Sequence, residues 1–126
     1  MAGVNARMAR DIGAEPPRTQ PGKTIARKVR AIRDSARGED CQVRIPGACT
    51  GNPEHTIWSH APMGAAGKGM GIKAVDVAGA YCCTTCDAVV DGQRPAPAGM
   101  TRDAVLLAWF MGHMRSLVLL ARRGLV

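Results

Sequence analysis

The sequence has few aromatic side chains: phenylalanine, tyrosine and tryptophan make up only 3% of its 126 residues. One phenylalanine, one tyrosine and two tryptophans supply little bulk for anchoring a hydrophobic core. The length excludes more than one domain of ordinary size. A small domain with a thin core gains stability from a covalent or metal staple. We therefore expect one small domain that is held together by more than apolar packing.

The first thirty residues lack the apolar segment of a secretory signal peptide. We therefore expect a cytoplasmic protein, whose thiols stay reduced. Cysteine occurs five times, and an odd number would leave one thiol over in a closed disulfide framework. Clustered cysteines in a reducing compartment bind metal more often than they form disulfides. Metal binding is thus the favoured interpretation, with disulfides as the alternative.

A long hydrophobic run without charge is also absent. Residues 104–121 are mostly apolar and long enough to raise the question of a membrane span. His113 and Arg115 lie near the middle, however, and a central Arg costs about 2.5–3.5 kcal/mol even on a lenient insertion scale. Thr101 is a suitable N-cap and Gly124 a suitable end. We predict a long core helix of a soluble protein and no membrane partner, with a span as the alternative.

Positive charge is present in excess, and most of it lies at the front of the chain. The formal net charge is +7; residues 1–37 hold nine Lys and Arg against three acids, and the remainder holds eight against seven. A basic arm beside a nearly neutral domain suits a polyanion such as DNA. A solvated tail that only aids solubility is the alternative.

Composition divides the chain into three parts. Residues 1–22 contain three prolines and few large apolar groups, which indicates a disordered basic arm. Residues 23–38 have apolar side chains at helical spacing and basic ones elsewhere, which predicts a basic amphipathic helix. Residues 39–126 form the expected folded domain, in which HTIWSH at residues 55–60 is predicted to be a short strand ending near His60. The predicted nucleic-acid contacts are Arg27, Lys28, Arg30 and Arg33 on the helix, Arg44 on an expected strand at 41–45, and Lys68 and Lys73 on or beside a glycine-rich loop.

The cysteines fall into two pairs, Cys41 with Cys49 and Cys83 with Cys86. In a C-x₂-C turn both thiolates can reach one ion, and two such pairs give the closed S₄ set of a structural zinc site. The first pair brackets an expected strand and a Pro-Gly turn and can form a looser knuckle of the same kind. Cys82 is left over and is expected to be a buried spectator. Four unrelated core thiols are the alternative.

The segments "GEDCQVRIPGACTGNPE", "SH" at 59–60, "IKAVD", "YCCTTCDAVVDGQ" and "GHMRSLVLLARRGLV" resemble, in that order, the YbcO-like family. These are small phage and prophage proteins regarded as HNH-type nucleases. The resemblance runs from about Arg37 to the C-terminus. It implies an α+β fold with a zinc-stapled ββα-metal (His-Me finger) HNH-like core at 39–126, a basic N-terminal helix and a long C-terminal helix, acting on DNA inside a bacterial host.

The same resemblance implies roles for three further residues. His60 stands at the family's histidine and is the expected general base, since imidazole accepts a proton near neutral pH. Asp87 occupies the position of a metal-ligating histidine, and its carboxylate would prefer Mg²⁺ or Mn²⁺. Asp76 falls at an acidic position and is expected to orient His60 or help bind the ion.

Two departures from the family pattern concern the catalytic ion. HNH nucleases often have Asp directly before the base histidine, where this chain has Ser59, and the helix histidine is replaced by Asp87. The resemblance implies a metal-dependent DNA endonuclease that hydrolyses phosphodiester bonds. The alternative is a non-catalytic zinc module that binds nucleic acid or a phage partner.

Overall fold

The protein is an α+β domain, as expected, and the computed structural model describes residues 23–67 and 76–126. Within these residues lie the helices α2 (Lys23–Asp34), α3 (Thr84–Val90) and α4 (Arg102–Arg122) and the strands β1 (Thr56–His60) and β2 (Gly79–Cys83). Two short 3₁₀ turns span Pro53–His55 and Gly64–Ala66. The predicted arm at residues 1–22 lies outside the described part of the chain.

The two strands form an antiparallel sheet in which Thr56 pairs with Cys83 and His60 with Gly79. Helix α3 begins at the residue after β2, so the chain has the strand–strand–helix order that the resemblance led us to expect. The sequence predicted the first of these strands at residues 55–60, and β1 confirms it. The HNH fold itself is not established by this order of elements.

The strand expected at residues 41–45 is wrong. This segment is irregular, and Arg44 has a left-handed φ of 55° that no strand accommodates. The alternation of Cys41, Val43 and Ile45 arises instead because all three side chains are buried in a tight loop. A hydrogen bond of 2.8 Å from the Gln42 N–H to the Tyr81 carbonyl fastens this loop to the side of β2.

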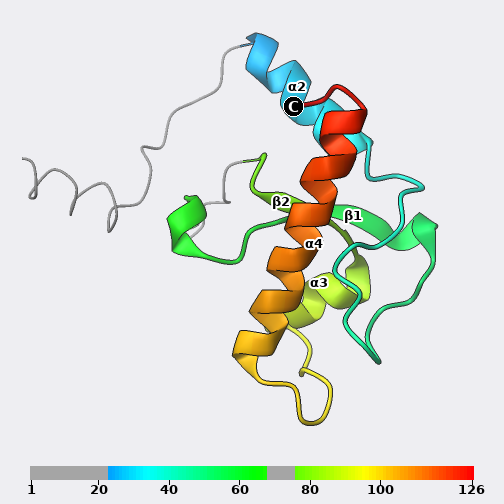
Figure 1. Ribbon diagram of the computed structural model, residues 1–126, viewed down its shortest axis with the longest axis vertical. Coiled ribbons are helices and arrows are strands. Elements are labelled where there is room, and N and C mark those ends of the chain that lie inside the picture. The colour runs from blue at the N-terminus through cyan, green and yellow to red at the C-terminus, as the bar shows by residue number, and fades with distance from the viewer. Residues whose placement is uncertain (1–22, 68–75) are drawn as a thin grey trace, which may run out of the picture.

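Helix α4 crosses the sheet and packs mainly on β2 (Figure 1). Its N-cap is Thr101, as predicted, and the Thr101 hydroxyl accepts a hydrogen bond of 3.1 Å from the Ala104 N–H. The buried face of α4 consists of Val105, Trp109, Gly112, Ser116 and Leu120. Gly112 allows the closest approach, because a Cβ built there would lie 2.7 Å from Val43 Cγ2 and 2.9 Å from Val43 Cα.

The core is divided into two clusters. One surrounds the cysteines and includes Val43, Ile45 and Trp109. The other holds Trp58 and Tyr81, whose rings meet edge to face at 5.2 Å, with residues of α2 and the end of α4. Three of the four aromatic residues are therefore buried, so most of the few aromatic side chains lie in the core.

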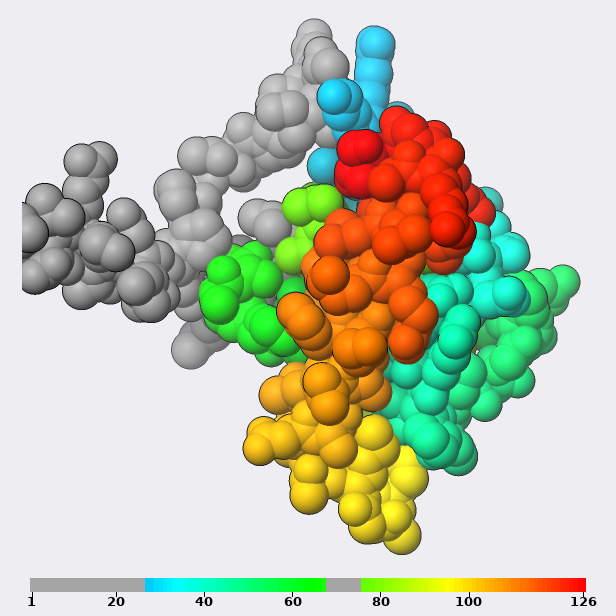
Figure 2. All heavy atoms as spheres, in the orientation of Figure 1, coloured from blue at the N-terminus to red at the C-terminus, as the bar shows by residue number. Residues whose placement is uncertain are grey.

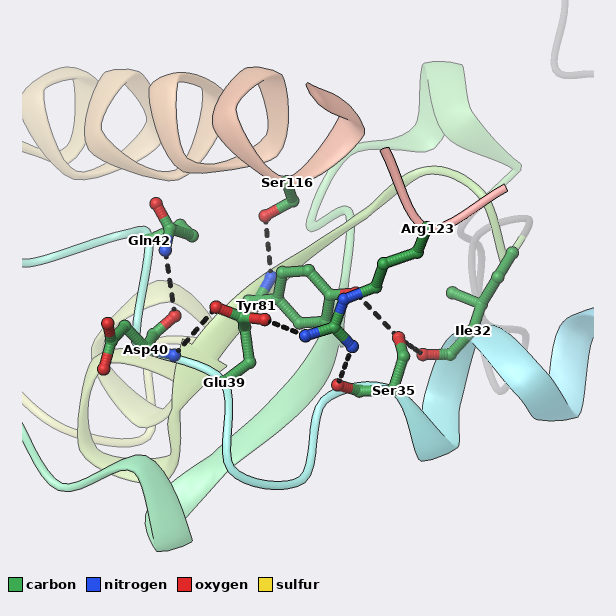
Figure 3. Close-up of polar contacts among 8 residues, drawn as sticks. All are labelled: Ile32, Ser35, Glu39, Asp40, Gln42, Tyr81, Ser116 and Arg123. Atoms are coloured by element: carbon green, nitrogen blue, oxygen red, sulfur yellow. Dashed lines mark hydrogen bonds and ion pairs between the residues drawn. The ribbon is translucent and has the colours of Figure 1, made fainter. Parts of the chain in front are cut away.

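Polar contacts tie α2 to the rest of the domain (Figure 3). The Ser35 hydroxyl lies 2.7 Å from the Tyr81 hydroxyl, and Arg123 donates to the Ser35 carbonyl and pairs with Glu39. The predicted helix at 23–38 ends earlier, at Asp34, and continues as turns to Gly38, which has a φ of 79°. Since the turns are the anchored part, the direction in which α2 points is set by β2 and the end of α4.

We predict that Gly112→Ala destabilises the protein even though alanine favours helices by about 1 kcal/mol over glycine. The added methyl group would meet the backbone of the 41–45 loop, and overpacking of this kind costs about 1–3 kcal/mol. We expect a melting temperature lower by roughly 5–10 °C in calorimetry. Lys28→Ala, at an exposed position of α2, is the control and should change stability by less than about 0.5 kcal/mol. A Gly112→Ala protein as stable as the wild type would contradict the close contact.

Candidate metal centre and histidine site

The structure brings together the four cysteines that the sequence paired. The Sγ atoms of Cys41, Cys49, Cys83 and Cys86 all lie within 4.8 Å of one another. The first pair comes from the loop before β1, and the second comes from the end of β2 and the first turn of α3. Segments more than thirty residues apart in the chain thus meet at one point.

Main-chain N–H groups surround these sulfurs. The Arg44 N–H donates to Cys41 Sγ and the Cys86 N–H donates to Cys83 Sγ, each at 3.5 Å. The Gly51 N–H faces Cys49, and the Ile45 N–H faces Cys86. Each sulfur therefore has at least one main-chain donor, which stabilises it as a thiolate.

This donor set fits one tetrahedral metal ion. With Zn–S bonds of about 2.3 Å, the sulfurs of an S₄ site lie about 3.8 Å apart, which agrees with the observed clustering. Three of the four cysteines are buried and Cys49 is partly exposed. Cys82 is fully buried beside the cluster, and its thiol donates to the Cys83 carbonyl at 3.4 Å. The four ligands predicted from sequence are those that converge.

Close contacts and burial lower the pKa of one cysteine thiol and raise the pKa of three others. Hydrogen bonds from Cys82 and Cys86 lower the pKa of Cys41. The contact with Cys41 raises the pKa of both Cys82 and Cys86, while burial raises the pKa of Cys49. A bound divalent cation would displace protons from the ligating thiols, since thiolate is the form that ligates.

A second polar site lies at the end of β1. His60 Nε2 is 2.9 Å from Asp76 Oδ1, and both side chains are largely buried. The same carboxylate oxygen accepts hydrogen bonds from Arg33 Nε at 3.1 Å and Nη2 at 2.8 Å. Three elements therefore meet here: β1, the segment before β2, and α2. The sequence suggested that Asp76 orients His60 or helps to bind the ion, and the two side chains are in contact.

Asp76 is an ionised partner in this group. Partial burial alone would raise its pKa, but hydrogen bonds from His60 and Arg33 and the charge of Arg33 outweigh burial and lower it. The carboxylate consequently stays negative throughout the neutral range. Its main chain also takes part, because Trp58 Nε1 donates to the Asp76 carbonyl at 2.5 Å. Both the side chain and the backbone of Asp76 are therefore fixed to core elements.

Asp87 contacts Ser59, the residue before His60 on β1. Its Oδ1 accepts a hydrogen bond of 2.6 Å from Ser59 Oγ, which in turn accepts one of 3.3 Å from Trp109 Nε1. Ser59 thus occupies the place of an expected metal ligand and instead holds Asp87. The position of Asp87 in the first turn of α3 also suits the helix dipole.

The three predicted catalytic residues are only partly brought together. His60 and Asp76 are in contact, whereas Asp87 contacts Ser59, the neighbour of His60 on β1. In the described residues, 23–67 and 76–126, the cysteines form the one group of three or more metal-ligating side chains whose ligand atoms converge. His60, Asp76 and Asp87 do not form a second one.

The predicted nucleic-acid contacts differ in their surroundings. Arg27, Lys28 and Arg30 are exposed on α2. Arg33 is half-exposed and paired with Asp76. Arg44 folds back onto the loop that carries Cys41, where its guanidinium donates to the Cys41 carbonyl and to Gln42 Oε1. Lys68 and Lys73 lie outside the described residues.

Sequence reasoning missed two contacts that shape the sites. Arg33 was assigned to DNA alone, although it also binds Asp76; no local pattern links residues 43 positions apart. Arg115 was seen only as a charge that opposes a membrane span. Its guanidinium donates twice to the Gln42 carbonyl, at 2.6 and 3.2 Å, and so joins α4 to the cysteine loop. The sequence signal that could have predicted this contact is the presence of an arginine within a mostly apolar helix.

Comparison with known proteins identifies a family that matches most of the chain. A family described as "Putative nuclease YbcO" matches residues 30–125. This chain belongs to the YbcO family. The resemblance inferred from the motifs is thereby confirmed, and the family's name supports a nuclease function at a coarse level. The match includes the last part of α2, which the motifs alone had left outside.

Two YbcO proteins illustrate the relationship. Those described as "Putative nuclease YbcO" in Escherichia coli strain K12 and in Enterobacteria phage 82 are each 32% identical over 96 residues, which is 75% of this chain and 95% of theirs. A solved structure, titled as a putative bacteriophage protein from Escherichia coli K-12, has a TM-score of 0.58 and 26% identity, and it covers 75% of this chain and 100% of its own. The fold is thus shared with a phage-type protein.

We predict that purified protein contains one equivalent of bound metal, measured by inductively coupled plasma mass spectrometry. Cys83→Ser should lower the content to less than one tenth, because a hydroxyl is a poor replacement for thiolate in this set. Cys82→Ala is the matched control, one residue away and equally buried, and should retain the metal. Loss of metal in both variants, or in neither, would contradict the assignment of ligands.

Proposed function

We propose that this protein is a metal-dependent DNA endonuclease of phage or prophage origin. The observation that carries the proposal is the histidine at the end of β1, held by an ionised carboxylate on the strand–strand–helix unit whose strand–helix junction bears the clustered cysteines. Membership of a family named for nuclease function supports it. The reaction is hydrolysis of a phosphodiester bond, with 5′-phosphate and 3′-hydroxyl ends implied by the likeness to HNH nucleases.

His60 is the proposed general base. Asp76 accepts from Nε2, which makes Nε2 the protonated nitrogen and leaves the lone pair on Nδ1. Nδ1 would then take the proton from the attacking water, a role suited to an imidazole near neutral pH. Asp76 is a positioning residue in this scheme: it fixes the tautomer and the ring orientation, and its charge favours the imidazolium that forms.

The ion at the four cysteines is proposed to be zinc, with a structural role. Four thiolates form the closed set typical of structural zinc and offer no open position for substrate. Cys83 is also the N-cap of α3, so a metal bound there fixes the junction between β2 and α3. That junction carries Asp87 one residue beyond Cys86.

A second ion, Mg²⁺ or Mn²⁺, is proposed at Asp87. Its carboxylate is a hard oxygen ligand, and such ions are commonly held by one or two carboxylates with water and substrate phosphate supplying the rest. When bound, the ion would neutralise the charge on the departing 3′ oxygen. Ser59 would orient the carboxylate through its hydrogen bond.

Helix α2 is the proposed DNA-binding element of the described chain. Its exposed basic side chains lie on the helix that supplies Arg33 to Asp76, so phosphates bound along it would be led towards His60. The arm at residues 1–22 would add affinity that falls steeply with salt. The contacts would be to the phosphate backbone and so independent of base sequence.

One observation favours a second candidate, a non-catalytic metal-stapled module that binds nucleic acid or a phage protein. Asp87 is engaged by Ser59, and in the described chain His60, Asp76 and Asp87 do not form a second metal-ligating group. Such a protein would need the cysteine site and α2 but no divalent ion at Asp87. The first candidate hydrolyses DNA and the second does not, whereas both can bind nucleic acid.

A plasmid-nicking assay with Mg²⁺ or Mn²⁺ separates them. We expect the wild type to relax supercoiled DNA and His60→Ala to lose at least about 100-fold in rate, since general-base catalysis contributes about 10²–10⁴. His55→Ala is the control: this exposed histidine contacts Thr50 and Asn52 and should leave the rate unchanged. Retained DNA binding without turnover in all three proteins would favour the second candidate.

A second prediction concerns Asp76. Asp76→Asn keeps a hydrogen-bond acceptor for His60 but removes the charge, so kcat should fall by about tenfold while KM for DNA stays within about twofold. Removing one phosphate contact would instead raise KM. A tenfold rise in KM with an unchanged kcat would show that Asp76 acts on substrate binding and not through His60.

A further inference from the structure

Helix α4 is apolar on both of its faces. One face packs on the sheet, and the opposite face carries five large apolar side chains that are about half exposed or more: Leu107 at 61%, Phe110 at 48%, Met111 at 46%, Met114 at 47% and Val118 at 50%. We call these five residues the outer stripe. A contiguous apolar patch of this kind on a small domain marks an interaction site more often than chance.

Nothing in the described chain covers the outer stripe. Figures 1 and 2 show α4 lying in front of the sheet as a ridge along this face of the molecule. At 100° per residue the stripe is centred directly opposite the buried side chains of Trp109 and Ser116. The two apolar faces explain why α4 is long and apolar enough to pass for a membrane span.

Four of the five residues of the outer stripe, all except Phe110, are placed symmetrically along α4, which favours a second copy of the same helix as the partner. Leu107 and Val118 lie equally far from the midpoint between Gly112 and His113, and so do Met111 and Met114. Two copies of α4 packed antiparallel about a two-fold axis at this midpoint would place Leu107 opposite Val118 of the other copy. Each Met111 would likewise face a Met114. A two-fold pairing requires such self-complementarity.

Charges at the ends of the stripe follow the same symmetry. Asp103 and Arg122 are both exposed, lie equally far from the same midpoint, and project within about 60° of the midline of the stripe. Antiparallel pairing brings each Asp103 to the same level along the helix axes as the Arg122 of the other copy, so opposite charges meet at both ends of the contact. A parallel pairing would oppose like charges.

A lipid surface fits these observations less well. Interfacial helices carry cations along the polar border of the apolar face, whereas an acid flanks one end of this stripe. A span would also expose the buried face of α4 and break the two hydrogen bonds from Arg115 to the Gln42 carbonyl. A second copy satisfies both the apolar surface and the terminal charges.

We propose that this protein forms a symmetric homodimer through antiparallel contact of the outer stripes of two α4 helices. A contact between two single helices is smaller than a standard interface, so the dimer should be weak, with a dissociation constant on the order of 50 µM. The proposal does not depend on the function proposed above, because the outer stripe lies on the side of α4 that faces away from the sheet.

Analytical ultracentrifugation of the metal-loaded full chain from about 2 to 300 µM tests the dimer. The weight-average mass should rise from near the 13.3 kDa of one chain towards twice that value. Met111→Glu with Met114→Glu places four like charges at the two-fold axis and should weaken association at least tenfold. Unchanged circular dichroism and metal content would show that this variant is folded. A wild type that stays at one-chain mass throughout would overturn the proposal.

Charge reversal tests the antiparallel geometry. Asp103→Arg and Arg122→Asp should each weaken self-association, because each single variant opposes like charges at both ends. An equimolar mixture of the two variants restores two opposite-charge pairs and should form a heterodimer at wild-type strength. A mixture no stronger than either variant would overturn the pairing.

A vesicle-binding experiment distinguishes binding to a lipid surface from dimerisation. Monomeric wild-type protein that co-sediments with phosphatidylglycerol–phosphatidylcholine vesicles, and loses this binding in the Met111→Glu, Met114→Glu variant, would assign the stripe to a membrane and overturn the proposal. Absence of vesicle binding together with concentration-dependent mass supports the dimer.

Discussion

The convergence of four cysteine sulfurs is the constraint on which the rest of the structure depends. Cys41 and Cys49 come from a loop without regular structure, and Cys83 and Cys86 come from the junction of β2 and α3. With so few aromatic side chains, apolar packing alone supplies little to hold an irregular loop against the sheet. A metal bound by thiolates contributes folding free energy directly, with apparent values of about 10–16 kcal/mol in zinc-finger peptides.

The geometry of the candidate site depends on the junction between β2 and α3. Cys83 pairs with Thr56 at one end of the sheet and caps α3, so the register of β1 and the first turn of α3 are fixed together. His60 then lies at the far end of β1, where Asp76 holds it. Arg33 reaches the same carboxylate because the turns after α2 are anchored to Tyr81 and Arg123 (Figure 3).

Sequence alone predicted the features that rest on local spacing. The C-x₂-C pair, the strand ending at His60 and the cap at Thr101 each have a short-range signature, and the structure confirms them. The strand expected at 41–45 was wrong because the alternation reflected a buried loop with Arg44 at positive φ. Contacts across many residues, such as Arg33 with Asp76 and Ser59 with Asp87, have no local pattern and needed the fold.

X-ray absorption at the zinc edge of the purified, unmodified protein tests the central claim most directly. The account predicts a single shell of four sulfur atoms at about 2.3 Å, the distance of zinc–thiolate bonds. A shell containing nitrogen or oxygen ligands, or a folded protein with no zinc signal, would contradict it, because the loop, the sheet and α3 would then be held together by something else.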